Sequence, residues 1–319
     1  MSASQPYFIQ GPLTAEIANI RSPVRQFLDE LCSSGLRDIQ RRYREKASEL
    51  AVPSVPRSDA DPGTVGTAAD WLLRFLVDSE PELDLVMTGA AACARAGIRV
   101  LPALAEVVRA LGMSLPSRPA EHVRVFTGPT GGNNADAVVL ARSCWAFALL
   151  TEAYRGGPMV AAAGPLGQFR GAAVTGDDLL GLAPPAGLDQ LAGFRHVFNA
   201  TLITQLATRT GAWALGPTFT GSALIKADAD LITAGLLIDL KTSAKKPSLA
   251  VTDLFQVIGY ALLDFDDEYR LNALGIFSAR YAYLATWELP ALLSELAGHN
   301  VDLRMVRGRF RDLLLACRA

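Results

Sequence analysis

The sequence predicts an α/β protein, in which a mixed central sheet is flanked by helices and preceded by a mostly helical N-terminal region. Over about the first 185 residues, apolar side chains recur at helical spacing, as in residues 66–77. From residue 188 onward, short β-competent runs alternate with helical segments, an order that builds a sheet covered by helices. We therefore expect residues 1–185 to form the helical region and residues 186–319 to form the α/β core.

The helices of the N-terminal region are predicted from amphipathic segments separated by helix-breaking residues. A linker rich in Pro, Ser and Asp is expected at 52–62, and a loop with one short helical turn is expected in the segment 156–185, which is rich in Gly, Ala and Pro. The predicted helices are, in order, one or two within 14–50, then 66–77, 101–111 and 137–154.

The elements of the C-terminal part follow from the same periodicities. They are a helix at 188–209, a short strand at 217–220, a hairpin at 222–243, a helix at 251–265, strands at 271–279 and 281–287, and a helix at 290–316.

The hairpin is the most informative segment of the chain. Its two apolar runs are joined by Thr233-Ala234-Gly235, with a glycine where a positive φ is expected. A two-residue turn at Ala234-Gly235 pairs Thr233 with Leu236. Because strand side chains alternate between faces, this register decides which acidic residues meet.

In this register Asp230 lies opposite Asp239, and Asp228 lies opposite Lys241. Directly opposed residues have Cβ atoms roughly 4.5–5.5 Å apart on one face. Two carboxylates at that distance repel each other unless a positive charge lies between them, and a divalent cation with oxygen ligands fits this position. The pattern favours a metal-dependent phosphodiester site, although a solvated hairpin face with Asp and Lys is the simpler alternative.

A helix after the hairpin carries Gln256 and Tyr260, which lie one turn apart on one face. The combination resembles the PD-(D/E)XK nuclease superfamily, in particular its RecB-like branch, over roughly the last 130 residues. That branch has an Asp on one strand, D/E-x-K-T on the next and Q-x3-Y on the following helix. The matching residues here are Asp230, then Asp239, Lys241 and Thr242, then Gln256 and Tyr260. The resemblance implies a restriction-endonuclease-like core and a nuclease that cleaves DNA to leave 5′-phosphates.

The resemblance also implies roles for these residues. Asp230, Asp239 and the backbone carbonyl of Leu240 are expected to bind Mg²⁺ or Mn²⁺, and Lys241 is expected to place the attacking water. Further candidate metal ligands are Asp228 and, on earlier helices, Glu152 and Asp70, of which Asp70 ends a G-x-x-x-acid pattern. The candidate substrate-binding residues are Gln256, Tyr260, Thr242, Lys245 and Lys246. Arginines of the last helix could contact phosphates as well, namely Arg304, Arg307, Arg309, Arg311 and Arg318.

Composition limits the other possibilities. Half of the 319 residues are apolar and the net charge is −2, so nucleic-acid contact must come from local clustering of charge. The four cysteines are widely separated, which indicates thiols in a reducing compartment rather than disulfides or a zinc site. The N-terminus lacks a signal-peptide pattern and charges interrupt the apolar stretch 86–115, so we expect a cytoplasmic protein without a membrane span.

Two alternatives to an active nuclease remain open at this level. One is a nuclease-fold protein that binds nucleic acid or a partner in a defence or repair complex without cutting. It is motivated by the acidic net charge and by the lack of an acid beyond Asp189 on the helix before the strands. The other is an effector whose helical N-terminal region docks a protein partner.

Overall fold

The computed structural model describes residues 8–9, 11–50, 53–116 and 124–318. In this part of the chain the centre is a six-stranded sheet in the order β1-β2-β3-β4-β5-β6. All neighbouring strands are antiparallel except β4 and β5, which are parallel, so the sheet is mixed as predicted. The strands are β1 (Val125–Phe126), β2 (Trp213–Leu215), β3 (Leu231–Thr233), β4 (Leu236–Lys241), β5 (Ala273–Ser278) and β6 (Tyr283–Glu288).

The register of β3 and β4 is the predicted one. Thr233 pairs with Leu236 across a two-residue turn in which Ala234 and Gly235 have φ values of 48° and 77°. Positive φ at both central residues gives the turn a twist that matches the strands on either side. The side chains of β4 therefore alternate as expected: Ile238 packs in one hydrophobic core and Leu237 packs in the other.

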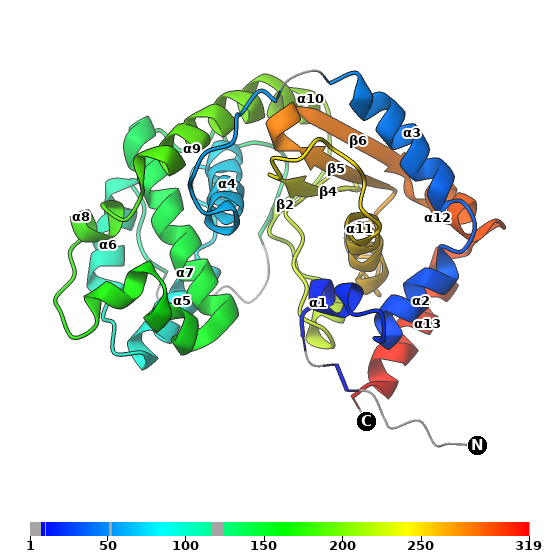
Figure 1. Ribbon diagram of the computed structural model, residues 1–319, viewed down its shortest axis with the longest axis horizontal. Helices are drawn as coiled ribbons and strands as arrows, with labels where there is room; N and C mark the ends of the chain where they lie inside the picture. The colour runs from blue at the N-terminus through cyan, green and yellow to red at the C-terminus, as the bar shows by residue number, and fades with distance from the viewer. Residues whose placement is uncertain (1–7, 10, 51–52, 117–123, 319) are drawn as a thin grey trace.

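One face of the sheet is covered by the helices of the middle of the chain (Figure 1). Their core includes Trp71, Phe147 and Phe194, which pack with Ile238 of β4. The helices are α4 (Pro62–Val77), α5 (Asp84–Arg95), α6 (Leu101–Ala110), α7 (Ala137–Ala163), α8 (Gly176–Leu180) and α9 (Pro185–Val197). A 3-10 turn, η1 (Pro165–Phe169), lies between α7 and α8.

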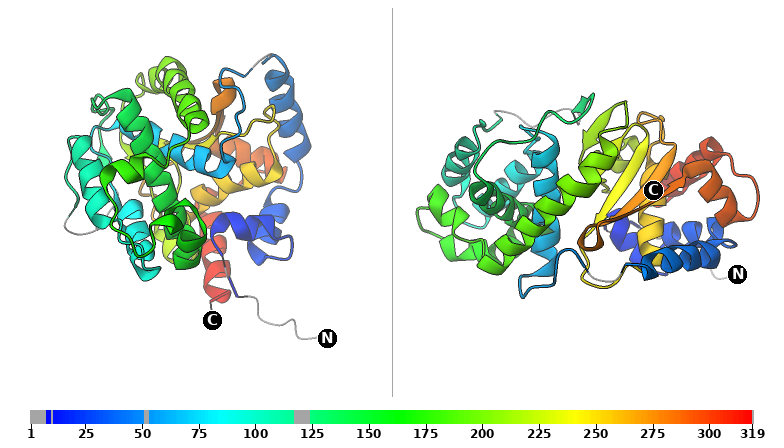
Figure 2. Two further views of the ribbon diagram at one scale, coloured as in Figure 1. Left: turned by 60° about the vertical axis from the view of Figure 1, so that its left-hand side comes forward. Right: turned by 90° about the horizontal axis from the view of Figure 1, so that it is seen from above.

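The other face is covered by helices from both ends of the chain, as the view from above shows (Figure 2). These are α1 (Leu13–Ala18), α2 (Pro23–Leu31), α3 (Leu36–Ser48), α11 (Val251–Leu263), α12 (Leu289–Ala297) and α13 (Leu303–Ala316). Leu13 and Leu28 share one core with Phe255, Leu274 and Phe310. The boundary expected at residue 185 therefore does not coincide with the division between the two cores, because the first three helices pack with the C-terminal segment.

Several elements differ from the sequence prediction. The short strand lies at β2 rather than at 217–220, and the first half of the hairpin contains a 3-10 turn, η3 (Thr220–Ala223), before β3 begins. Another 3-10 turn, η4 (Ala279–Tyr281), links β5 to β6. The helix at 188–209 includes a π-helical turn, η2 (Phe198–Ile203), before the short α10 (Thr204–Leu206).

The last predicted helix is divided into α12 and α13. Gly298, with φ of 75°, ends α12 in the left-handed conformation that a glycine adopts readily. The Asp302 side chain then accepts the backbone N–H groups of Arg304 and Met305 and begins α13.

Helix α7 continues beyond its predicted end to Ala163. Its backbone departs from helical geometry at Gly157, which has φ of 72°, and Pro158 follows. By length and apolar composition α7 is long enough to cross a membrane, but 67% of its most apolar window is buried inside the protein. The helix therefore has the burial of a core helix. The four cysteines are buried and free, in agreement with the sequence.

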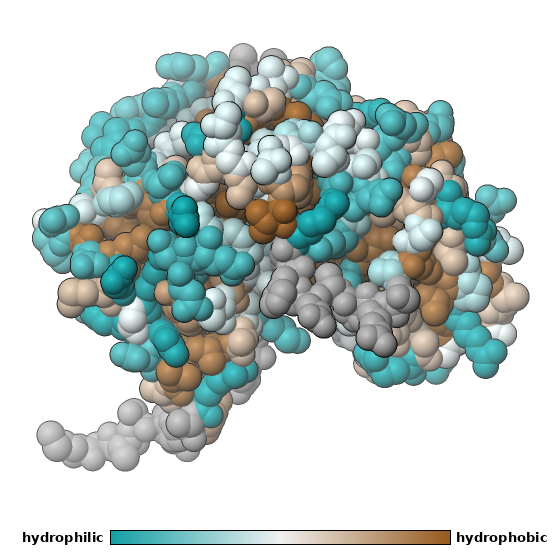
Figure 3. Space-filling model, turned by 180° about the vertical axis from the view of Figure 1, so that it is seen from behind, coloured by the Kyte–Doolittle hydropathy of each residue, from teal (hydrophilic) through white to brown (hydrophobic). Residues whose placement is uncertain are grey.

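On the face opposite to Figure 1, apolar residues lie in separate patches among hydrophilic ones (Figure 3). This distribution is the usual one for a protein surface. The chemically distinctive region is instead a cavity between the two helical layers.

Candidate active site

A cavity of about 940 Å³ opens beside the start of β3 and the end of β4. Helices α4, α7 and α11 and the segment before β3 contribute to its wall. The charged and polar residues that line it include Asp70, Arg155, Lys226, Asp228, Asp230, Asp239, Lys241, Gln256, Tyr260 and Arg318. Acids distant in sequence therefore share one cavity with several cations.

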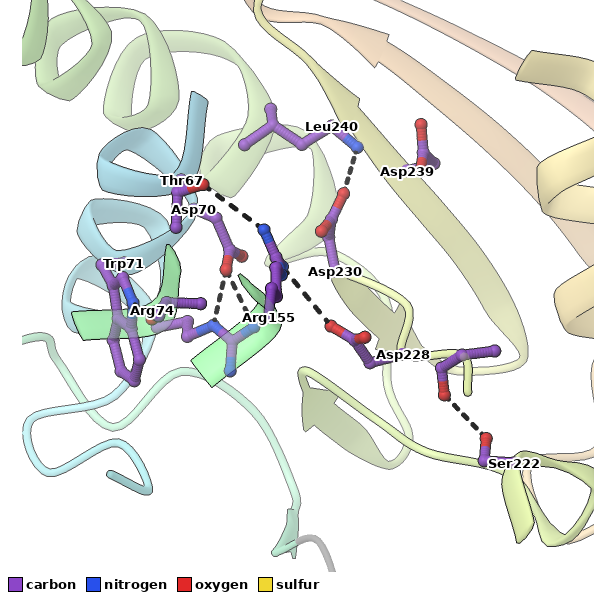
Figure 4. A network of polar contacts seen from close by, with 12 residues as sticks. Thr67, Asp70, Trp71, Arg74, Arg155, Ser222, Asp228, Asp230, Asp239 and Leu240 are labelled. Atoms are coloured by element: carbon purple, nitrogen blue, oxygen red, sulfur yellow. Dashed lines mark hydrogen bonds and ion pairs between the residues drawn. The ribbon is translucent and has the colours of Figure 1, made fainter. Parts of the chain in front are cut away.

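Asp230 and Asp239 both line the cavity and interact through their charges, although the ladder of β3 and β4 ends one pair before them, at Leu231 with Ile238. Asp230 directly precedes β3, and its Oδ2 accepts a hydrogen bond of 2.6 Å from the backbone N–H of Leu240 (Figure 4). Asp239 on β4 is 2% exposed. Burial, together with the charges of Asp239 and Asp70, raises the pKa of Asp230 well above its usual value. Burial also raises the pKa of Asp239, although the charge of Lys241 opposes this effect.

The Leu240 carbonyl is on the side of β4 expected for a ligand near Asp230. In a strand, the N–H and C=O of one residue point toward the same neighbouring strand. Since the Leu240 N–H reaches Asp230, its carbonyl is directed to the same side, and Leu240 lines the cavity.

Lys241 is held by acids of β4 and α11. Its Nζ lies 2.8 Å from Asp239 Oδ2 and 3.4 Å from Asp253 Oδ1, and it donates to Gln256 Oε1 at 2.9 Å. Burial opposes the charged form of Lys241, but the charges of Asp239 and Asp253 outweigh it and raise its pKa. Lys241 is therefore a cation and hydrogen-bond donor at neutral pH.

Gln256 connects the members of this group, as its spacing on α11 allows. Its Nε2 donates to Asp239 Oδ1 at 2.9 Å and to the Tyr260 hydroxyl at 2.7 Å, while its Oε1 accepts from Lys241. One amide thus holds both the acid and the lysine. Tyr260 is 5% exposed, and burial raises its pKa well above the usual value, so its hydroxyl stays protonated.

Asp70 lines the same cavity and lies on α4, one of the helices that cover the other face of the sheet from α11. Its Oδ2 accepts hydrogen bonds from Nη2 and Nε of Arg74, at 2.8 and 3.1 Å. Its Oδ1 is buried and has no hydrogen-bond partner in the part of the chain that the structure describes. An unsatisfied buried carboxylate oxygen is costly and indicates a place for a missing polar or charged partner.

Glu152 and Asp228 are placed differently from the other acids. Glu152 lies outside the cavity, beside Thr64, and burial raises its pKa. Asp228 lines the cavity, but the cross-strand pair expected between Asp228 and Lys241 is not formed. The ladder ends at Leu231, and Asp228 instead makes an isolated bridge with Thr218.

The remaining predicted substrate contacts lie around the cavity or away from it. Thr242 follows β4, where its Oγ1 lies against Gly66 of α4, 3.0 Å from the position a Cβ would take. Lys245 and Lys246 are exposed in the loop after β4, and Lys246 Nζ donates to the Ser48 carbonyl at the end of α3. None of these three residues lines the cavity.

The five arginines expected to contact phosphates do not lie together: Arg304, Arg309 and Arg311 are exposed on α13, whereas Arg307 is buried and Arg318 lines the cavity. Arg307 is 5% exposed and binds Asp264 and Asp267, so it stabilises the core of the protein. Arg309 lies over the Phe27 ring, and Arg318, which follows the end of α13, lines the cavity. The sequence did not distinguish Arg307 from the other arginines, because the spacing of charges along a helix does not show which of them packs against acids of another segment.

The sequence did not point to three charged residues of the site: Asp253, which pairs with Lys241, and Arg155 and Lys226, which line the cavity. Asp253 lies three residues before Gln256, a spacing that places both on one face of α11, so this residue could have been found. Arg155 follows no motif and reaches the cavity only because α7 packs beside it.

The residues present fit a divalent cation bound together with its substrate. No group of three or more His, Cys, Asp or Glu side chains arranged to hold a metal ion occurs among the described residues. Mg²⁺, however, is commonly bound by one or two carboxylates together with substrate phosphates and water. Asp230 and Asp239 supply such a pair, and the unsatisfied Oδ1 of Asp70 adds negative charge beside them.

Comparison with known proteins adds no assignment: no protein-family model, no curated protein and no solved structure matches the chain.

Proposed function

We propose that the protein is a Mg²⁺- or Mn²⁺-dependent nuclease of RecB-like PD-(D/E)XK type, which hydrolyses phosphodiester bonds in DNA. The observation that carries the proposal is the convergence of Asp230, Asp239, Lys241 and Gln256 on one cavity. The motif residues are separated by up to 26 positions, from 230 to 256, yet hydrogen bonds and an ion pair join Asp239, Lys241 and Gln256, and Asp230 binds the backbone between Asp239 and Lys241. A solvated hairpin face would not bury Asp239 or share its contacts in this way.

Each residue then has a defined role. Asp230 and Asp239, with the Leu240 carbonyl, would hold the cation, and its charge would offset the burial and the neighbouring acids that raise the pKa of both carboxyl groups. When bound, the cation supplies polarisation of a phosphate oxygen and a water of lowered pKa. Lys241 keeps its proton and donates hydrogen bonds from Nζ to the attacking water or to a phosphate oxygen. Gln256 fixes the direction of that amine.

The proposal is tested by cleavage of linear, circular and single-stranded DNA with Mg²⁺, Mn²⁺ or EDTA. We expect metal-dependent cleavage that is abolished in Asp239→Ala and Lys241→Ala, while both variants keep the fold by circular dichroism. Asp189→Ala, at an exposed position of α9, is the matched control and should cleave like the wild type. Undiminished cleavage by the Asp239 and Lys241 variants would refute the assignment.

A second candidate is a binding module of the same fold that does not cleave. It is favoured by the lack of a three-ligand metal cluster in the described residues and by the ion pairs that already occupy Lys241. Calorimetric titration with Mg²⁺ and Mn²⁺, in the presence and absence of DNA, separates the two. Binding of DNA without any uptake of metal would favour the module.

A further inference from the structure

Arg155 is an exposed cation at the edge of this acidic cavity. It lies two residues before Gly157, where the backbone of α7 leaves helical geometry, and its side chain is 52% exposed. Its Nη1 donates to Thr67 Oγ1 on α4 at 3.4 Å, and its Nη2 lies 3.9 Å from Asp228 Oδ2 (Figure 4). The guanidinium thus lies between α4 and the segment that leads into β3.

Both contacts of Arg155 are long. A hydrogen bond of 3.4 Å is near the limit for an interaction of this kind, and an exposed ion pair of 3.9 Å stabilises a protein little. Arg155 can therefore exchange partners at small cost. A guanidinium binds carboxylate and phosphate oxygens in the same forked geometry, so the Asp228 carboxylate occupies a place that suits a phosphate.

The acids of the cavity favour such an exchange, although Lys226 and Arg318 also line it. Asp70, Asp230 and Asp239 together repel a phosphodiester that approaches them. Lys241 is already paired with acids on both sides and offsets this repulsion only in part. Arg155 is the cation that α7 contributes to the cavity wall, and its exposed side chain can reach a strand that enters there.

We propose that Arg155 is a substrate-binding residue, which exchanges the Asp228 carboxylate for a phosphate of the nucleic-acid backbone when a strand enters the cavity. The inference rests on the proposed function and deepens it. Asp228 is then the ion-pair partner of Arg155 in the absence of nucleic acid, and it is not a metal ligand. Its negative charge disfavours the binding of other anions to Arg155 while no strand is present.

The test is equilibrium binding of a fluorescein-labelled 12-nucleotide DNA, followed by anisotropy in EDTA at several salt concentrations. We expect Arg155→Gln to weaken binding about fivefold and to lower the slope of log K against log salt by about one. Arg109→Gln, at an exposed position of α6 outside the cavity, is the control and should bind like the wild type. Equal thermal midpoints for the three proteins show that the fold is unchanged.

Asp228→Asn supplies the specific readout. If the two side chains exchange as proposed, this substitution tightens binding more in the wild type than in the Arg155→Gln background, so the two effects are not additive. Additive effects, or an Arg155→Gln variant with the wild-type affinity and salt slope, overturn the role of Arg155. Wild-type protein that neither binds nor cleaves DNA contradicts the proposed function itself and removes the basis of the inference.

Discussion

The carboxylate of Asp230 accepts the backbone N–H of Leu240 at 2.6 Å, which joins the start of β3 to the end of β4. The bond continues the contact between the strands beyond their last ladder pair, Leu231 with Ile238. It holds Asp230 beside Asp239 although both acids are disfavoured when charged. Burial and the charge of Asp239 raise the pKa of Asp230, and this leads to the first prediction.

The metal-free protein should lose stability as the pH rises. Burial and the charges of Asp239 and Asp70 raise the folded-state pKa of Asp230 above its ordinary value of 3.8. Between the two pKa values the folded state binds more protons than the unfolded chain, so the free energy of unfolding falls through that window. In EDTA at pH 8 we expect Asp230→Asn, which keeps an acceptor for Leu240, to be more stable than the wild type by about 1 kcal/mol.

Thermal unfolding of both proteins between pH 4 and pH 8 checks this. The difference should shrink toward pH 4, because there the wild-type carboxyl is protonated in the folded state. Added Mg²⁺ should stabilise the wild type more than the variant. A variant less stable than the wild type at pH 8 would contradict the interpretation.

Gln256 should affect the rate of cleavage more than the binding of DNA. Its amide donates to Asp239 and accepts from Lys241, so Gln256→Ala leaves both side chains without their common partner. We expect a 10- to 100-fold lower single-turnover rate, the usual effect of losing a residue that orients the reacting groups. Gln256→Glu keeps the acceptor but loses the donor and adds a charge beside Asp239. A normal rate in both variants would exclude the positioning role.

Arg307 should be far more important for stability than Arg309. Arg307 donates to the Ala261 carbonyl and pairs with Asp264, whose side chain is fully buried. Removing one partner of a buried pair leaves an uncompensated charge, so Arg307→Ala should cost about 3–5 kcal/mol. Arg309→Ala, at a side chain that is 61% exposed, should cost about 1 kcal/mol or less. Urea denaturation of the two variants measures the difference in their free energies of unfolding. Equal losses of stability would show that the buried pair of Arg307 and Asp264 contributes no more than the exposed contacts of Arg309.

Two glycines should respond in opposite directions to substitution by alanine. A Cβ at Gly89 of α5 would collide with the Leu150 carbonyl oxygen of α7, so Gly89→Ala must separate α5 from α7. We expect a loss of about 2 kcal/mol or more from this overpacking. A Cβ at Gly308 of α13 meets nothing within 4 Å, so Gly308→Ala should stabilise the helix by about 0.5–1 kcal/mol. Chemical denaturation checks both, and a tolerated Gly89→Ala would show that the two helices can separate at little cost.

The sequence predicted the hairpin well because its geometry is local. The turn at Ala234-Gly235 determines the register, and the two-residue period of a strand places Asp239 on the same face as Lys241. The helical period likewise predicted that Gln256 and Tyr260 would be neighbours. The same logic failed for Asp228, because the chain leaves the ladder before that residue and local alternation no longer applies.

Backbone periodicity and turn chemistry were enough to predict the mixed α/β class and the register of β3 against β4. The sequence did not predict that Asp70 and Arg155 line the same cavity, or that Arg307 is buried away from it. These placements depend on how whole helices pack against the two faces of the sheet. Packing of that kind is set by contacts between residues far apart in the chain, which periodicity within one segment does not record.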